Sequence, residues 1–223
     1  MSASTATGEA APTTAFRSFV WRRLGTILAL APLGVWVVIH VWNNLAAFRG
    51  AEAWQESVTN HRHPIAAAIT WVVVLTPLAI HTLWGLGRLK TSQPNNMAYG
   101  YFGNLRYLLQ RISALGVLGF VAAHLWLAFL QPRFVHGHPE RFADIAREMA
   151  HHMPTLVVYL LGTMGVAYHL ANGVATSAMA FGVGTTARSQ KRMERVALVL
   201  FVVLLALSWG AIYGLWQAGG AAA

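Results

Sequence analysis

The chain of 223 residues has no cysteine and few charged residues. Only 10% of its residues are Asp, Glu, Lys or Arg and 56% are hydrophobic, whereas a soluble domain carries about 25% charged residues. Without cysteine the chain can form no disulfide, no thiolate zinc site, no Cys-ligated iron–sulfur cluster and no covalent c-type haem. The scarcity of charge indicates that lipid surrounds most of the folded chain.

Acidic residues are fewer than basic ones, 7 against 16, which gives a formal net charge of +9. A nucleic-acid-binding protein gathers such charge on one folded face. Here Lys and Arg separate apolar runs, so we expect no nucleic-acid partner. The first 15 residues are rich in Ala, Ser and Thr and have no basic region before a short apolar run, unlike a cleaved signal peptide. We expect residues 1–18 to form a disordered tail.

Five long apolar stretches occupy residues 24–46, 64–87, 107–130, 155–181 and 196–216. Crossing about 30 Å of hydrocarbon takes roughly 20 residues of helix, so each stretch is long enough to span a membrane. Lipid satisfies no backbone polar groups, and the alternating pattern of a barrel strand is absent, so the spans must be helical. Pro32 and Pro77 predict tolerated kinks. The sequence predicts an all-α fold, an integral membrane bundle of five transmembrane helices over residues 19–218.

Basic residues gather on one side of this predicted bundle. The N-terminal segment and the segments between spans two and three and between spans four and five hold 11 basic and 2 acidic residues. The segments on the other side hold 5 of each. Because basic loops remain in the cytoplasm, we expect the N-terminus inside the cell and the C-terminus outside.

Four of the ten histidines lie within predicted spans, one in each of the first four: His40, His81, His124 and His169. The other six lie in outer loops, where solvated surface residues are the plain interpretation. An ionisable residue in a membrane span is costly and points to function. One such histidine is readily explained by a hydrogen bond in the core. Four of them, with no Asp, Glu or Lys inside the spans to pair with, indicate a bound cofactor.

The depth of each histidine predicts which ones meet. At a rise of 1.5 Å per residue, His40 and His124 lie roughly 24 Å into spans that begin on the cytoplasmic side. His81 and His169 lie roughly 21 to 25 Å into spans that begin outside. The four therefore form an outer pair and an inner pair, about 15 Å apart along the membrane normal.

Two neutral imidazoles facing each other are the axial ligands that a low-spin haem iron uses. Two imidazoles without a third ligand make a poor site for a lone zinc or iron ion. Glycines near two of these histidines would leave room for a macrocycle, although small residues also allow helices to pack closely in membranes. They are Gly85, Gly162, Gly165 and Gly173, with Thr176 on the same face as the last three.

The chain resembles a known family in six strings: RGAEAW (49–54), LTPLAIHTLWG (75–85), NLRYLLQR (104–111), AAHLW (122–126), YHLANG (168–173) and ARSQK (187–191). With the histidine spacing, they resemble the single-chain dihaem cytochrome b subunit of bacterial succinate:quinone oxidoreductases, over residues 19–216. In that family spans one and three hold the distal haem and spans two and four the proximal one. The resemblance implies two haem b groups, one ligated by the outer pair of histidines and one by the inner pair.

The resemblance also implies partners and a location. The chain would anchor a flavoprotein subunit and an iron–sulfur subunit to the cytoplasmic face of the bacterial inner membrane. Electrons from succinate would pass through the iron–sulfur centres and the two haems to a membrane quinone, and this chain itself would not touch succinate.

Haem propionates need cationic or hydroxyl partners, and five residues lie at the inner ends of spans one and three: Arg22, Arg23, Thr26, Arg111 and Ser113. The arginines are explained equally well as determinants of topology. For the quinone, Asn43, Asn44 and the loop at 54–63 are candidates.

Some dihaem fumarate reductases that resemble this chain carry a glutamate in span four, thought to conduct protons. Here no span has an Asp or Glu in its apolar interior, which favours menaquinone over ubiquinone if the membrane potential drives the reaction. Two alternatives remain open from the sequence. One is a dihaem cytochrome b of another quinone-linked dehydrogenase or a transmembrane ferric reductase. The other is a non-haem transporter or anchor with hydrogen-bonding histidines, although no internal repeat supports a transporter.

Overall fold

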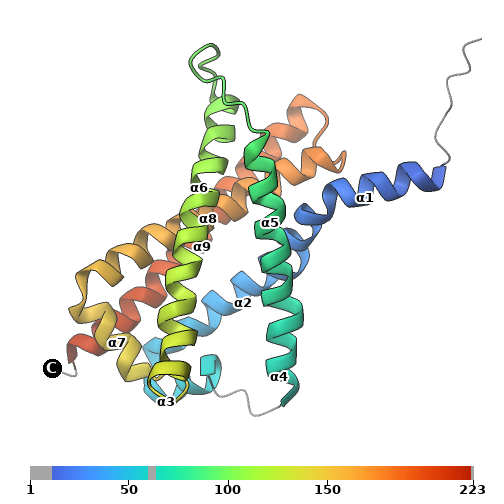
Figure 1. Ribbon diagram of the computed structural model, residues 1–223. Coiled ribbons are helices and arrows are strands. Elements are labelled where there is room, and N and C mark those ends of the chain that lie inside the picture. The colour runs from blue at the N-terminus through green and yellow to red at the C-terminus, as the bar shows by residue number, and fades with distance from the viewer. Residues whose placement is uncertain (1–11, 60–63, 222–223) are drawn as a thin grey trace, which may run out of the picture.

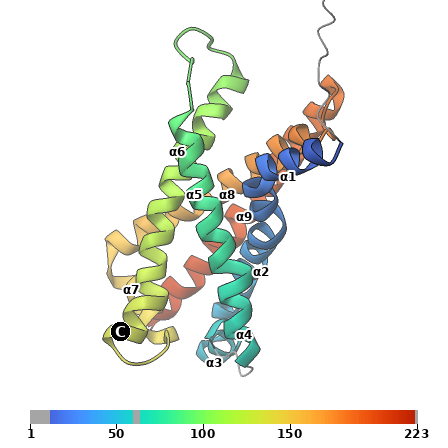
Figure 2. The same cartoon turned by 45° about the vertical axis from the view of Figure 1, so that its right-hand side comes forward.

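The computed structural model describes residues 12–59 and 64–221, and all regular structure in these two ranges is helical. Five helical stretches are long and apolar enough to cross a membrane: Arg23–Arg49, Thr70–Lys90, Phe102–Val135, Met153–Ala180 and Ala187–Ala221. They confirm the five predicted spans and the all-α class. The chain runs back and forth, so α5 and α6 lie side by side while α8 and α9 cross behind them (Figures 1 and 2).

The first span is built from α1 (Pro12–Leu28), η1 (Ala29–Gly34) and α2 (Val35–Asn44), and η2 (Leu45–Arg49) ends it. We expected a disordered tail at 1–18, but α1 already begins at Pro12. Proline suits the first turn of a helix because its missing N–H would have no partner there. Of the expected tail, residues 1–11 lie outside the described residues.

The second span comprises α4 (Pro64–Ile69), η4 (Thr70–Leu75) and α5 (Thr76–Lys90), and the third comprises α6 (Phe102–Leu125) and η5 (Trp126–Val135). Wide π-helical turns replace sharp kinks at the prolines. Pro32 lies inside η1 and Pro132 inside η5, while Pro77 is the second residue of α5, just after η4. A proline removes an N–H and crowds the carbonyl four residues earlier, and a wider turn relieves both.

Short helices close one end of the bundle (Figure 1). They are α3 (Ala51–Trp54), η3 (Gln55–Thr59) and α7 (Phe142–His151). Gly50, at φ +100°, lets the chain turn back from the first span into α3. The last two spans are single helices, α8 (Met153–Ala180) and α9 (Ala187–Ala221).

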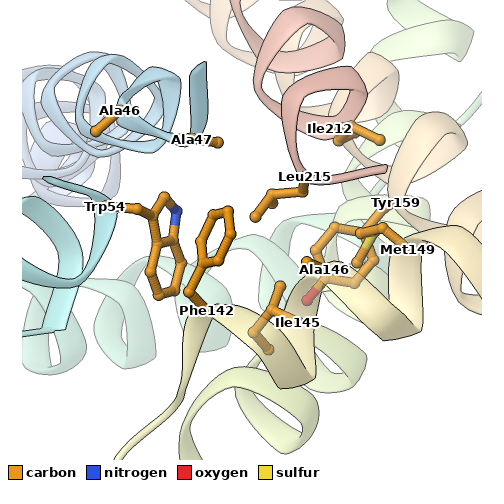
Figure 3. Close-up of a cluster of buried hydrophobic side chains, with 10 residues drawn as sticks. All are labelled: Ala46, Ala47, Trp54, Phe142, Ile145, Ala146, Met149, Tyr159, Ile212 and Leu215. Carbon is orange, nitrogen blue, oxygen red and sulfur yellow. The ribbon is translucent and has the colours of Figure 1, made fainter. Parts of the chain in front are cut away.

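A cluster of buried hydrophobic residues lies at this end, where α7 packs against α9 and α3. Trp54 and Phe142 face each other in it, with ring centres 5.6 Å apart, and Met149 is fully buried (Figure 3). The loops at residues 91–101 and 181–186, which basic residues flank at Lys90, Arg106 and Arg188, lie at the opposite end (Figure 1). Most other apolar side chains point outward, as expected for a surface in contact with lipid.

Candidate functional site

The outer pair consists of His40 on α2 and His124 on α6. Their ring centres lie 5.7 Å apart with the planes at 74°. Each ring stacks on an aromatic residue one turn earlier in its own helix, His40 on Trp36 and His124 on Phe120. Because residues four apart in a helix lie on one face, the spacing itself places both aromatic rings beside the site.

The inner pair consists of His81 on α5 and His169 on α8. Their ring centres lie 6.2 Å apart with the planes at 70°. The structure thus brings together the same two pairs that depth predicted. Their role as ligands stays a prediction.

Both separations suit a metal ion bound between the two rings. An imidazole nitrogen lies about 2 Å from its metal and the ring centre about 1 Å further, so opposed rings on one iron are about 6 Å apart. Among the residues that the structure describes, no group of three or more His, Cys, Asp or Glu side chains could hold a metal ion. The two pairs therefore fit bis-imidazole haem ligation better than a metal ion held by the protein alone.

Three of the four rings have a partner at Nδ1. His81 Nδ1 lies 2.9 Å from the carbonyl oxygen of Gly25, and His124 Nδ1 lies 3.0 Å from the hydroxyl of Tyr159. His169 Nδ1 lies 3.2 Å from Gln110 Nε2 and 3.3 Å from Ser113 Oγ. Metal-ligating histidines are held in this manner, with the second ring nitrogen hydrogen-bonded. The arrangement leaves Nε2 of His81 and His124 free to face a metal, whereas His169 Nδ1 has an amide donor and a hydroxyl beside it.

His40 is held differently. Asn44 donates from Nδ2 to the His40 carbonyl at 2.8 Å and approaches His40 Nε2 at 3.5 Å. The indole N–H of Trp54 donates to Asn44 Oδ1 at 3.2 Å, and Trp54 is only 2% exposed. Asn44, one of the sequence candidates for a quinone site, thus ties α3 to the end of α2. Residues 60–63 of the candidate loop lie outside the described residues.

The five propionate candidates do not converge on one point. The side chain of Arg22 lies outside the part of the chain that the structure describes. Arg23 Nε is buried without a hydrogen-bond partner, and its guanidinium carbon lies 5.8 Å from the centre of the Phe19 ring. Thr26 is half-buried on the next turn. An orphaned buried donor two residues from Gly25, which contacts His81, suits a carboxylate of a bound group.

The other two candidates have partners within the protein. Arg111 donates to Ser92 Oγ at 3.0 Å and to the Tyr107 hydroxyl at 3.1 Å, and it lies over the Tyr107 ring. Ser113 donates to the Gln110 carbonyl and contacts His169. In this structure Arg111 fixes the segment after α5, and Ser113 faces the inner pair directly.

The glycines divide between the two roles considered for them. A Cβ at Gly162 would overlap the Phe120 ring, so Gly162 serves close packing of α8 against α6. A Cβ at Gly165 or Gly173 would meet its nearest neighbour only at 3.7 or 3.8 Å, and one at Gly85 would meet nothing within 4 Å. Packing alone therefore does not require glycine at these three positions.

Sequence reasoning missed Tyr159 and a group of polar side chains around His169. Arg106, Gln110 and Asn172 join three helices by hydrogen bonds. The available signal was their position in the quoted strings 104–111 and 168–173, since polar residues within or beside spans usually have a function.

Comparisons with known proteins agree with this geometry. The sequence model of one protein family, described as succinate dehydrogenase/fumarate reductase transmembrane subunit, matches residues 97–208, about half of the chain. The chain is also 29% identical over 198 residues to the succinate dehydrogenase cytochrome b558 subunit of Bacillus subtilis (strain 168). That similarity covers 88% of this chain and 96% of the relative. No solved structure matches the chain.

Proposed function

Because the chain belongs to the succinate dehydrogenase/fumarate reductase transmembrane subunit family, we propose that it carries electrons between an iron–sulfur subunit and a membrane quinone through two b-type haems. The observation that carries the proposal is the pair of opposed imidazoles at each of two levels. The chain is a membrane cytochrome b subunit of this family. The number of haems, the quinone and the electron path are the proposal.

His40 and His124 would hold one iron and His81 and His169 the other, each through a neutral ring nitrogen. Each haem, when bound, supplies a one-electron redox centre. The protein contributes orientation through the partners of the ring nitrogens, and its apolar helices exclude water. Arg23 would hold a propionate of the inner haem, because its buried Nε has no other partner. Arg22 and Thr26 remain candidates beside it, while Arg111 and Ser113 would act through the contacts already described.

The basic end of the bundle would face the cytoplasm and bind the iron–sulfur subunit, with the flavoprotein subunit beyond it. Succinate would be oxidised on that flavoprotein subunit and not on this chain. Electrons would enter near the inner pair and leave near the outer pair to reduce a quinone, for which we propose menaquinone. The absence of Asp and Glu from the apolar interior of the spans supports this choice, since no carboxylate is available to carry protons across with the electrons.

A reduced-minus-oxidised absorption spectrum of the purified complex tests the proposal. We expect b-type bands that titrate as two components in a redox titration. A complex without b-type bands would overturn the haem assignment and favour a non-haem anchor. A single component would reduce the proposal to one haem.

A further inference from the structure

A row of hydrogen-bonded side chains leads from the basic end of the bundle to the inner pair. It joins α6, α8 and α9 and comprises Glu194, Arg106, Asn172, Gln110 and His169; we call it the polar relay. Arg106 contacts Glu194 at 3.0 Å and donates twice to Asn172 Oδ1, at 3.0 and 2.8 Å. Asn172 Nδ2 donates to Gln110 Oε1 at 2.7 Å. Gln110 Nε2 lies 3.2 Å from both Nδ1 and the carbonyl oxygen of His169.

The polar relay is exposed at Glu194 and most buried at Asn172, in its middle. The Glu194 side chain is 50% exposed and that of Arg106 16%, whereas Asn172 is only 4% exposed. Burying amide groups is costly unless they are hydrogen-bonded. An apolar residue would fill these positions without that requirement, so the relay indicates a function beyond packing.

Arg106 determines the direction of every bond in the relay. A guanidinium only donates, so the amide oxygen of Asn172 must face Arg106 and its amide nitrogen must face Gln110. Gln110 then presents its own oxygen to Asn172 and its N–H groups to His169. His169 is thus the end of a row of donors that starts from a cation.

This direction of the hydrogen bonds limits which group can accept a proton from the His169 ring. If Nε2 binds a metal, Nδ1 carries the proton, and the nearest acceptor for it is the hydroxyl of Ser113 at 3.3 Å. Ser113 Oγ is itself committed as a donor to the Gln110 carbonyl, at 3.1 Å. His81, on the other side of the inner site, has a backbone carbonyl as its acceptor. The two rings of the inner pair therefore differ in their surroundings. His81 Nδ1 faces a backbone carbonyl, which can accept its proton, whereas His169 Nδ1 faces an amide donor and a hydroxyl.

We propose that Arg106, Asn172 and Gln110 are positioning residues that fix the His169 ring and, by presenting donors to it, keep it a weak electron donor to the inner haem iron. A hydrogen-bond acceptor at the second ring nitrogen makes a histidine ligand more basic. The relay places an amide donor beside His169 Nδ1 and supplies no such acceptor. The inference rests on the proposed role of His169 as a ligand. It adds that the relay sets the reduction potential of the inner haem.

The test uses the intact complex and compares Gln110→Glu, Gln110→Leu and Thr163→Val. Thr163→Val is the matched control, because Thr163 lies on α8, six residues before His169, and its hydroxyl bonds carbonyls of its own helix. Redox titration and low-temperature electron paramagnetic resonance follow both haems. The inner component is identified as the one lost in His169→Ala.

In Gln110→Glu, a carboxylate oxygen replaces the amide nitrogen and accepts the Nδ1 proton. We expect the inner component to shift to a lower potential while the outer component and Thr163→Val stay at wild-type values. In Gln110→Leu, we expect a broadened inner resonance, since the ring loses its lateral support. Loss of the inner component alone in either variant also supports a positioning role.

The inference is overturned if the inner potential and resonance stay at wild-type values in both Gln110 variants, or if both components change equally. Loss of both haems in both variants would reduce the relay to a folding element and also overturn it. A wild-type complex without b-type bands would overturn the proposed function itself, which the wild-type spectrum shows before any variant is made.

Discussion

At the scale of single residues, the four intramembrane histidines differ in what holds each ring. His81 is held by a backbone carbonyl, His124 by the hydroxyl of Tyr159, and His169 by the polar relay. Only His40 lacks a close partner at a ring nitrogen in this part of the structure, because Asn44 bonds mainly to its carbonyl. These partners would act on each haem separately, so variants at one level should leave the other level unchanged.

The histidines themselves test the pairing. His81→Ala and His169→Ala should each abolish the same spectral component, while His40→Ala and His124→Ala should abolish the other. Each ring is one of two opposed ligands to a single iron, so loss of either ligand removes that haem. Difference spectra of the four variants in membranes check this. A loss that grouped His40 with His81 would contradict the geometry.

At the scale of elements, α7 and α9 approach so closely at Gly219 that no side chain larger than hydrogen fits between them. Gly219 of α9 is buried against α7, and a Cβ there would overlap the carbonyl group of Ala146 and crowd Ala150. His151, the last residue of α7, contacts the carbonyl oxygen of Gly219 at 3.3 Å. This close approach holds α7 in the hydrophobic cluster to which it contributes Phe142 and Ala146 (Figure 3).

Gly219→Ala should therefore destabilise the protein. Forcing extra volume into a packed contact lowers the free energy of unfolding by about 1 to 3 kcal/mol. The loss is expected here because the atoms in the way belong to the backbone of Ala146 and not to a flexible side chain. The midpoint of thermal unfolding in detergent measures the loss. Gly220→Ala is the matched control, since a Cβ at Gly220 would meet nothing within 4 Å; it should be neutral or stabilising by up to about 1 kcal/mol. Equal effects of the two substitutions would show that the close contact is unimportant.

At the scale of the whole molecule, charge separates the two ends of the bundle. Among the described residues, the end formed by α1, the segment after α5 and the start of α9 holds 11 basic and 1 acidic residue, and the other end holds 4 basic and 5 acidic residues. Such asymmetry orients a membrane protein. In the proposed orientation, the same charges would offer a surface to soluble subunits on the cytoplasmic side.

If that surface binds the iron–sulfur subunit, reversing its charge should release the soluble subunits from membranes. The variant Arg188→Glu/Lys191→Glu/Arg192→Glu changes the exposed start of α9, and subunit content of washed membranes measures the release. Arg147→Glu, at the opposite end, should retain the subunits. Full retention in the triple variant, with unchanged topology, would assign these residues to topology alone.

The spans also predict how the membrane potential acts. Electrons that leave the negative cytoplasm for an outer quinone, without accompanying protons, are driven outward by the potential, at about 2.3 kcal/mol per charge per 100 mV. An uncoupler should therefore slow succinate oxidation in intact cells. Succinate-to-dye activity, which bypasses the haems, should stay unchanged. An equal response of both activities, or no response of quinone reduction, would place the quinone on the cytoplasmic side or require another proton route.

The sequence by itself determined the five spans, the gathering of basic residues between them and the two histidine pairs. Each follows from a local property, either the length of an apolar run or the position of a residue along a helix of fixed rise. Depth sufficed for the pairs because a membrane confines every span to nearly one direction.

Only the tertiary structure decided which groups hold the histidines, because these contacts join residues far apart in the chain. Gly25 and His81 are 56 positions apart, and Arg106 and Asn172 are 66 apart. No periodicity encodes such a contact, since it depends on how each helix is rotated about its axis. For the same reason, Ser113 faces His169, Arg111 turns to Ser92, and Gly162 packs against Phe120, whereas the sequence gives only their level in the membrane.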